Sequence, residues 1–140
     1  MLAGATGFTG EWVAREALLQ ASGASVALAG RSEAKLHALA QALAAELCLR
    51  EPPAVLVADA EDAASLDKLC VRAKVVVSCV GPYRFWGEPV VSACVRGGAD
   101  YIDISGEPEF IERIAVDYGK AAKEAGVLVV SACGFDSIPW

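Results

Sequence analysis

The chain has 140 residues and a mass of 14.5 kDa, which suits a single domain with a sizeable core. It carries 12 Lys and Arg against 18 Asp and Glu, a formal net charge of −6, which argues against nucleic acid as a partner. Hydrophobic residues make up 55% of the chain, yet it contains no run of about 18 apolar residues, so we expect no transmembrane span. A sheet covered by helices on both faces would accommodate this apolar content.

Short β-branched runs alternate with longer Ala- and Leu-rich stretches, which is typical of repeated βαβ units in a parallel sheet. The predicted strands are Met1–Ala3, Ser25–Ala29, Ala54–Ala58, Val75–Val80, Asp100–Ile104 and Val127–Ala132. We predict one α/β domain over residues 1–140. Its fold is a doubly wound parallel sheet of the Rossmann type with strand order 3-2-1-4-5-6 and a shortened first strand.

Capping signals and apolar spacing predict helices between the strands. The predicted helices run over Glu11–Leu19, from a Ser32 cap through Leu47, from Glu88-Pro89 to near Gly97-Gly98, and from Pro108 to Gly126. Asp62 is interpreted as a further helix cap.

The sequence offers no metal-ligand pattern. The single histidine, His37, lies within a predicted helix and is interpreted as a surface residue. The cysteines are odd in number and form no C-x-x-C pair; they are Cys48, Cys70, Cys79, Cys94 and Cys133. We interpret them as small buried hydrophobes of an intracellular, reducing compartment.

The strongest chemical signal is the segment GATGFTG at residues 4–10, which follows the first predicted strand and runs into a helix. Glycine-rich turns also occur without ligands, but at this position the pattern is typical of dinucleotide binding. The backbone approaches a pyrophosphate there, and the helix N-terminus offers its free N–H groups. The residues predicted to bind the pyrophosphate are Gly4, Thr6, Gly7, Phe8 and Gly10.

About 20 residues past this loop, where a site for NAD places an acidic residue, the chain has Arg31 and Ser32. A guanidinium there favours the 2′-phosphate of NADP(H) over NAD(H), although Arg31 as a solvated residue at a helix start is the alternative. Asp59 follows the third strand, where it either contacts adenine or caps a helix.

The segment Gly81-Pro82-Tyr83 follows the fourth strand, near the point where the strand order reverses. We expect the cofactor to cross this backbone and the nicotinamide to lie beyond it. The aromatic segment 83–86 is interpreted as an exposed loop, either a wall of the cofactor cleft or a packing surface for another domain.

No residue is identified as catalytic, and Tyr83 and Asp136 are weak candidates. Ser105 and Glu107, after the fifth strand, either cap helices or contact substrate. No Y-x-x-x-K pair, phosphate-loop motif or nucleophile elbow occurs, and hydride transfer requires none of them because the nicotinamide carries that chemistry.

Taken together, the segments GATGFTG, AGRS, VVSCVGPYRFWGEPVV, YIDISGEPEF and SACGFDSIP strongly resemble the saccharopine dehydrogenase-like oxidoreductases. These are the animal proteins related to fungal saccharopine reductases and mycobacterial enoyl reductases. The resemblance covers essentially the whole chain. It implies an NADP-binding Rossmann domain, an oxidoreductase activity on an unidentified small molecule, and association with mitochondria, membranes or lipid droplets.

The family continues beyond the point that corresponds to Trp140, so we expect a second, catalytic domain to be absent and this chain alone to be inactive. The first hypothesis is the cofactor-binding half of an NADP(H)-dependent oxidoreductase, with a homodimer expected for the full-length protein. The alternative is a noncatalytic NADP(H)-binding or lipid-droplet-associated interaction module. A third reading is a truncated product that folds poorly alone.

Overall fold

The computed structural model describes residues 1–21 and 23–134 of the chain. In chain order the elements are β1 (Leu2–Ala3), α1 (Phe8–Gln20), β2 (Ala27–Gly30), α2 (Glu33–Glu46), β3 (Ala54–Val57), α3 (Ala63–Cys70), β4 (Val75–Ser78), α4 (Tyr83–Gly97), β5 (Asp100–Asp103), α5 (Pro108–Ala125) and β6 (Val129–Val130). The strands form one parallel sheet in the order β3-β2-β1-β4-β5-β6. This confirms the predicted Rossmann-type fold, including the short first strand.

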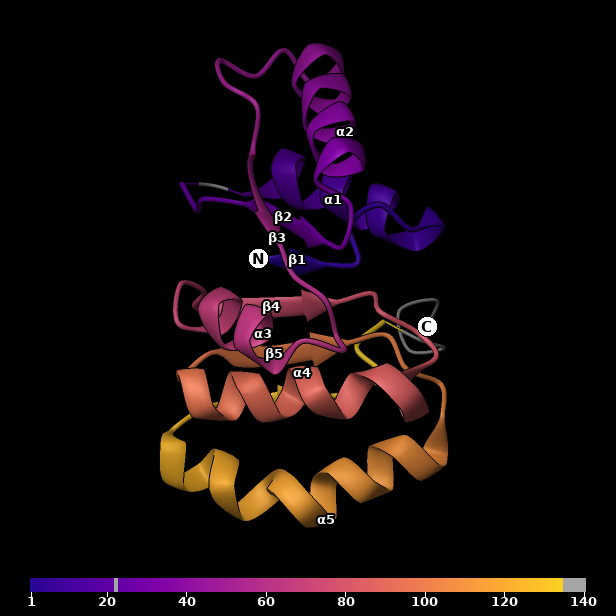
Figure 1. Cartoon of the computed structure of the whole chain (residues 1–140), viewed down its shortest axis with the longest axis vertical. Helices are drawn as coiled ribbons and strands as arrows, with labels where there is room; N and C mark the ends of the chain where they lie inside the picture. Colours follow the sequence, from indigo (N-terminus) through magenta and orange to yellow (C-terminus); the bar gives the residue numbers. More distant parts are fainter. Residues whose placement is uncertain (22, 135–140) are drawn as a thin grey trace.

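The sheet separates two hydrophobic cores, because successive side chains of a strand point to opposite faces. Ala3 and Val76 belong to the core formed with α3, α4 and α5, whereas Leu2 and Val77 pack toward α1 and α2. Figure 1 shows α1 and α2 beside β1, β2 and β3 in its upper half, and α3, α4 and α5 beside β4 and β5 below. Apolar runs without polar alternation are therefore explained by burial on both faces.

Burial of the second face is incomplete over β4, β5 and β6. The register aligns Val77 with Ile102 and Ile102 with Val130, so these residues share a face. On that face Leu128 is 66% exposed and Val130 is 42% exposed. The expected covering of both faces is therefore observed at the centre of the sheet, where Leu2 and Ala3 of β1 and Leu28 and Ala29 of β2 are all buried.

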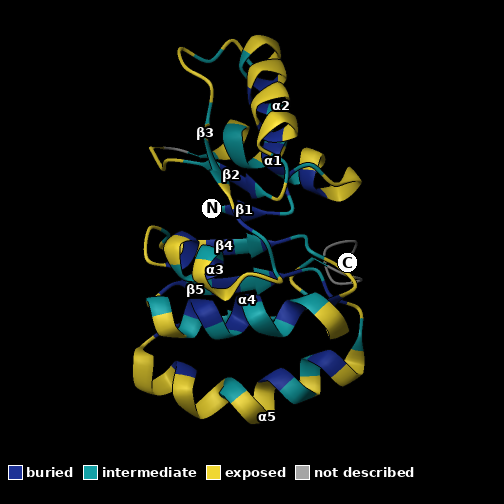
Figure 2. Ribbon diagram, in the orientation of Figure 1, coloured by how far each residue is buried: buried dark blue, intermediate teal, exposed yellow. Residues whose placement is uncertain are grey.

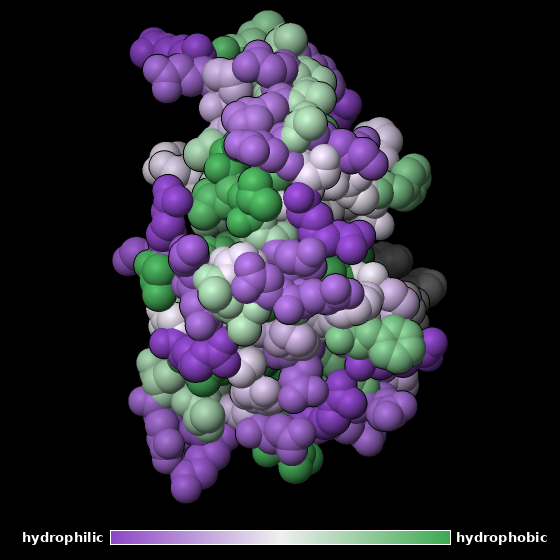
Figure 3. Space-filling view, viewed as in Figure 1, coloured by the Kyte–Doolittle hydropathy of each residue, from purple (hydrophilic) through white to green (hydrophobic). Residues whose placement is uncertain are grey.

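The edge strand β3 also carries exposed apolar surface. Val57 is exposed, and Figure 3 shows hydrophobic side chains gathered over this strand beside α2. Among the described residues, no helix is both long and apolar enough to cross a membrane.

The predicted start of α4 is wrong. The helix begins at Tyr83 rather than at Glu88-Pro89, and Pro89 lies inside it. The free N–H groups of Tyr83 and Arg84 are bound by the distant Glu107 carboxylate, which stabilises a start that local sequence rules do not indicate. Residues 83–86 are therefore the first turn of a helix and not a loop.

The other capping predictions are confirmed. The Ser32 hydroxyl accepts a hydrogen bond from the Lys35 N–H, and the Asp62 carboxylate accepts from the N–H groups of Ala64 and Ser65. Gly126 ends α5 with φ of 69°, in the left-handed region that favours glycine.

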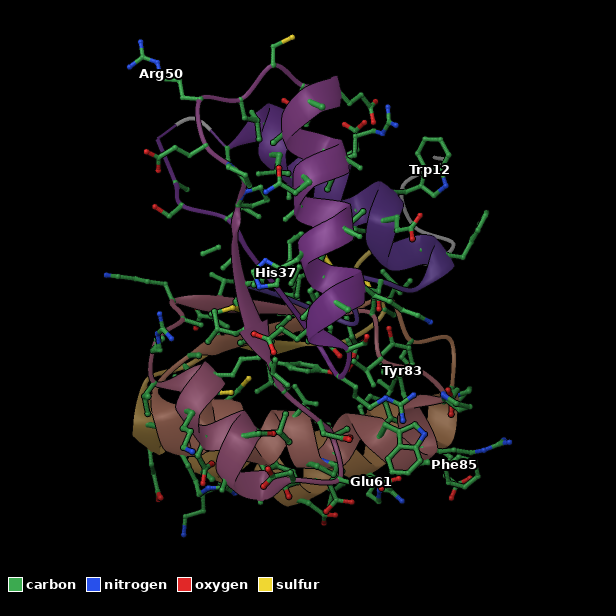
Figure 4. The ribbon with its side chains drawn as sticks, turned by 45° about the horizontal axis from the view of Figure 1, so that its top comes forward. Trp12, His37, Arg50, Glu61, Tyr83 and Phe85 are labelled. Atoms are coloured by element: carbon green, nitrogen blue, oxygen red, sulfur yellow. The ribbon has the colours of Figure 1, made fainter. Side chains whose placement is uncertain are left out.

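The cysteine prediction is confirmed for two residues and wrong for two. Cys70 and Cys94 are buried with their Sγ atoms 3.6 Å apart, whereas Cys48 and Cys133 are exposed. His37 lies on the surface of α2, as predicted, with its Nε2 atom 3.9 Å from Glu33 Oε1 (Figure 4).

Candidate functional site

A cavity of about 570 Å³ lies at the carboxyl ends of β1, β2, β3 and β4. It is lined by Ala3, Gly4, Thr6, Gly7, Ala29, Gly30, Arg31, Ser32, Lys35, Ala58, Asp59, Ala60, Glu61, Leu66, Leu69, Cys79, Val80, Gly81, Trp86 and Val90. In doubly wound sheets ligands bind at this edge, where the strand order reverses between β1 and β4.

Two glycines of the loop after β1 allow main-chain segments to approach closely. Gly4 has φ of 76°, and a Cβ atom there would lie 2.9 Å from the carbonyl carbon of Cys79. A Cβ atom on Gly10 would collide with the carbonyl oxygen of Gly4. Gly4 lines the cavity, while the buried Gly10 allows α1 to pack against the loop.

The N-terminus of α1 adjoins the cavity. Its N-cap residue, Gly7, has no side chain to bind the first N–H groups of the helix. Uncapped N–H groups at the positive end of a helix suit a phosphate. Phe8, which begins the helix, is 86% exposed and does not line the cavity.

Basic side chains line the cavity at the end of β2. Arg31 follows the strand, and Lys35 lies in the first turn of α2, four residues later. Among the described residues neither side chain forms an ion pair with a carboxylate of the protein. Two unpaired cations beside the Ser32 hydroxyl suit a phosphate monoester.

Acidic side chains line the cavity after β3. The Asp59 carboxylate accepts a hydrogen bond from the Glu61 N–H at 3.1 Å, which makes a tight turn. The Asp59 N–H donates to the Ser65 hydroxyl at 2.9 Å, so this turn is fixed to α3. Asp59 and Glu61 both remain at the cavity, where carboxylates can accept hydrogen bonds from an amino or hydroxyl group.

Gly81 and Trp86 form the wall nearest to β4, while Pro82 and Tyr83 do not line the cavity. Tyr83 is only 6% exposed, and its hydroxyl donates to the carbonyl oxygen of Ser78 at 2.9 Å. Burial, with further contributions from nearby Cys79 and Asp103, raises the pKa of Tyr83 above its ordinary value of 10. The phenol is therefore engaged within the protein and stays protonated at neutral pH.

The remaining predicted positions lie elsewhere. Ser105 and Glu107 do not line the cavity, and Asp136 lies outside the described residues. Phe85 projects outward from α4, as does Trp12 from α1 (Figure 4).

Sequence reasoning missed Lys35 as a site residue. Helical spacing gave no signal for it, because Arg31 precedes the extended N-cap Ser32 and is not part of α2. Leu66 and Leu69, which supply an apolar part of the cavity from α3, carried no signal that distinguishes them from core residues.

Comparison with known proteins gives consistent results. Residues 1–130 match the model of the saccharopine dehydrogenase NADP-binding domain. The chain is 50% identical over 148 residues to an Arabidopsis thaliana protein named "Probable mitochondrial saccharopine dehydrogenase-like oxidoreductase". It is 44% identical over 145 residues to the saccharopine dehydrogenase-like oxidoreductase of Mus musculus, and 48% identical over 139 residues to a lipid droplet localized protein of Caenorhabditis elegans.

The alignments cover 97–99% of this chain but only 32–34% of these relatives, so the chain spans about one third of their length. Among solved structures, apo saccharopine dehydrogenase from Saccharomyces cerevisiae has the same fold. The TM-score is 0.74 at 24% identity, with 96% of this chain and 27% of that chain covered.

Proposed function

Because the chain belongs to the family of saccharopine dehydrogenase NADP-binding domains, we propose that it is the cofactor-binding part of an NADP(H)-dependent oxidoreductase. The observation that carries this proposal is the pair of basic side chains, Arg31 and Lys35, at one end of the cavity. Residues at the uncapped N-terminus of α1 and Gly81 line the same cavity.

Each part of the cavity has a distinct role in this proposal. Arg31, Ser32 and Lys35 bind the 2′-phosphate, and the main chain of the glycine loop binds the pyrophosphate. Asp59 accepts a hydrogen bond from the adenosine part. The absence of a side chain at Gly81 leaves room for the nicotinamide against the backbone.

The bound nicotinamide would supply hydride transfer, and the protein would orient it and exclude water from one side. Trp86 and Val90 of α4 supply an apolar wall suited to this task. The Tyr83 hydroxyl is already engaged by the Ser78 carbonyl, so we assign it no proton transfer. A catalytic role of Asp136 stays a prediction.

A titration of NADPH and NADH tests the proposed cofactor specificity. Arg31→Asp is expected to lower NADPH affinity about 10- to 100-fold, because it removes a charge-assisted hydrogen bond and adds repulsion. NADH lacks the 2′-phosphate, so its affinity is expected to change less than threefold. Lys35→Gln is expected to reduce NADPH affinity in the same selective manner, by a smaller factor.

Arg50→Asp is the matched control, because it makes the same charge change on an exposed residue that does not line the cavity (Figure 4). Equal NADPH affinity in the wild type and Arg31→Asp would contradict the assignment. NADPH oxidation with a panel of imine, enoyl and keto compounds tests the oxidoreductase part. Turnover that Arg31→Asp abolishes would exclude a noncatalytic module.

The location of the protein is also proposed as mitochondrial or at lipid droplets. The names of the plant and nematode relatives support these two sites. Fluorescence microscopy of the tagged chain with mitochondrial and neutral-lipid dyes tests the proposal, and a diffuse signal that coincides with neither dye would contradict it.

A further inference from the structure

A buried carboxylate joins the ends of β5 and β6. Asp103 is 1% exposed, and its Oδ1 atom accepts hydrogen bonds from the N–H groups of Ser105 at 2.8 Å and Ala132 at 3.0 Å. Its Oδ2 atom accepts from the Ser131 hydroxyl at 3.0 Å. A buried charge is tolerated when several donors bind it, so Asp103 fixes the loop after β5 relative to β6.

The same loop places a second carboxylate. The hydroxyl of the buried Ser105 accepts a hydrogen bond from the Glu107 N–H at 3.2 Å. The Glu107 carboxylate in turn accepts from the Tyr83 N–H at 2.8 Å and from the Arg84 N–H at 3.0 Å. Both oxygens are therefore bound to the first turn of α4, more than twenty residues earlier in the chain.

Glu107 takes the place of a local cap. The N-cap residue of α4 is Pro82, which has no side-chain hydrogen bond to offer. A carboxylate at this end satisfies two free N–H groups and interacts favourably with the helix dipole. The start of α4, and with it the direction in which the chain leaves Gly81, thus depends on Glu107.

This start of α4 forms one end of the cavity. Gly81 lies two residues before Tyr83, the first residue of the helix, and it lines the cavity together with Trp86 and Val90, whereas Glu107 does not. Arg31, which follows β2, and Lys35, in α2, line another part of the cavity. Among the described residues, neither side chain forms a hydrogen bond with Asp103, Ser105 or Glu107. A change at Glu107 should therefore affect one end of the cavity selectively.

We propose that Glu107 is a positioning residue for the nicotinamide half of bound NADP(H), acting through the N-terminus of α4. The inference rests on the proposed function. Asp103 and Ser105 hold Glu107 in place, and the bound N–H groups of α4 hold the Gly81 backbone and Trp86 in the geometry that receives the ring.

The test compares two probes that share the adenosine end. NADPH occupies the whole proposed site, whereas 2′,5′-ADP contains only the adenosine and the 2′-phosphate. Glu107→Ala is expected to lower NADPH affinity about tenfold, the size of a lost helix cap, and to change 2′,5′-ADP affinity less than twofold. Glu107→Gln, which keeps one acceptor oxygen, is expected to show a smaller selective loss.

Glu109→Gln is the matched control, because Glu109 is exposed at the start of α5 and also loses one negative charge in the variant. Amide hydrogen exchange provides a readout independent of the cofactor. Faster exchange is expected at Tyr83 and Arg84 in Glu107→Gln, with Glu109→Gln matching the wild type.

The outcomes separate the two proposals. Wild-type protein that binds neither NADPH nor 2′,5′-ADP would overturn the proposed function. If the wild type binds both ligands and the Glu107 variants lose affinity for both equally, or for neither, the positioning role is overturned. The proposed NADP site then still stands. A loss of affinity for NADPH but not for 2′,5′-ADP in either folded Glu107 variant supports the positioning role.

Discussion

Tyr83 shows how burial changes the meaning of a single residue. In the sequence it stands in an aromatic and basic segment at the expected cofactor edge. In the structure its ring packs against Phe110, with centroids 5.7 Å apart, and its hydroxyl binds the Ser78 carbonyl. Nothing in the local sequence distinguishes an outward from an inward side chain at the first position of a helix.

The raised pKa of Tyr83 gives a prediction about stability and pH. At neutral pH, Tyr83→Phe is expected to lower the free energy of unfolding by about 1 kcal/mol, because the buried hydrogen bond to Ser78 is lost. Above pH about 10 the unfolded tyrosine releases its proton while the folded one keeps it, so wild-type stability falls as pH rises.

The difference between wild type and Tyr83→Phe should therefore shrink above pH 10. Urea unfolding followed by circular dichroism at neutral pH and at about pH 10.5 measures it. A constant difference across that range would contradict the raised pKa.

At the level of elements, the start of α4 illustrates a conflict between a local rule and a tertiary contact. Proline favours the first turn of a helix, which points to Pro89. The structure instead starts the helix six residues earlier and keeps Pro89 inside it. The Glu107 carboxylate that decides this lies in a different loop, so no window of sequence around Pro89 contains the information.

The contact between α4 and α5 leads to a prediction about two helical glycines. A Cβ atom on Gly87 would lie 2.5 Å from the Phe110 ring, whereas a Cβ atom on Gly119 of α5 would meet nothing within 4 Å. Gly87→Ala is expected to lower stability by about 1–3 kcal/mol through overpacking. Gly119→Ala is expected to raise it by about 0.5–1 kcal/mol, because alanine costs less entropy in a helix.

Chemical denaturation of the two variants and the wild type measures both effects. Because the substitutions are identical and both sites are helical, the comparison separates the contacts of Gly87 with Phe110 and Tyr83 from the effect of alanine on the helix backbone. Stability changes of the same sign and similar size in the two variants would show that the contact between α4 and α5 at Gly87 has room for a methyl group. Figure 2 shows the difference in environment, with α4 largely covered and the outer side of α5 exposed.

For the whole molecule, the half-covered sheet is the feature with the clearest physical consequence. Leu128 and Val130 lie exposed on the face opposite to α4 and α5. Exposed apolar patches of this kind favour association between molecules. The surface is continuous with the sheet, because Val130 aligns with Ile102 in the neighbouring strand.

A double variant tests this consequence. Leu128→Gln with Val130→Thr is expected to reduce concentration-dependent association and to change the free energy of unfolding by less than about 0.5 kcal/mol, since both side chains are exposed. Val116→Gln, on the outer side of α5, is the control for removal of an isolated exposed apolar residue. Unchanged association in the double variant, measured by analytical ultracentrifugation, would show that this face does not promote self-association.

The sequence by itself determined the parallel α/β fold, because buried strands and helices carry distinct apolar patterns over short windows. It also indicated Gly4, Thr6, Gly7, Arg31, Ser32, Asp59 and Gly81, which the fold brings to one cavity. These residues follow strand ends, and a parallel sheet places all such ends at one edge. The local sequence pattern and the strand order together were therefore sufficient to place these residues at one cavity.

Only the tertiary structure decided the inward direction of Tyr83, the position of Lys35 at the cavity and the binding of the α4 N-terminus by Glu107. The bonds to Glu107 join residues more than twenty positions apart, and their formation depends on how β4, β5 and the helix between them, α4, pack. Sequence spacing fixes which residues share a strand end or a helical turn. Packing fixes which of those side chains meet.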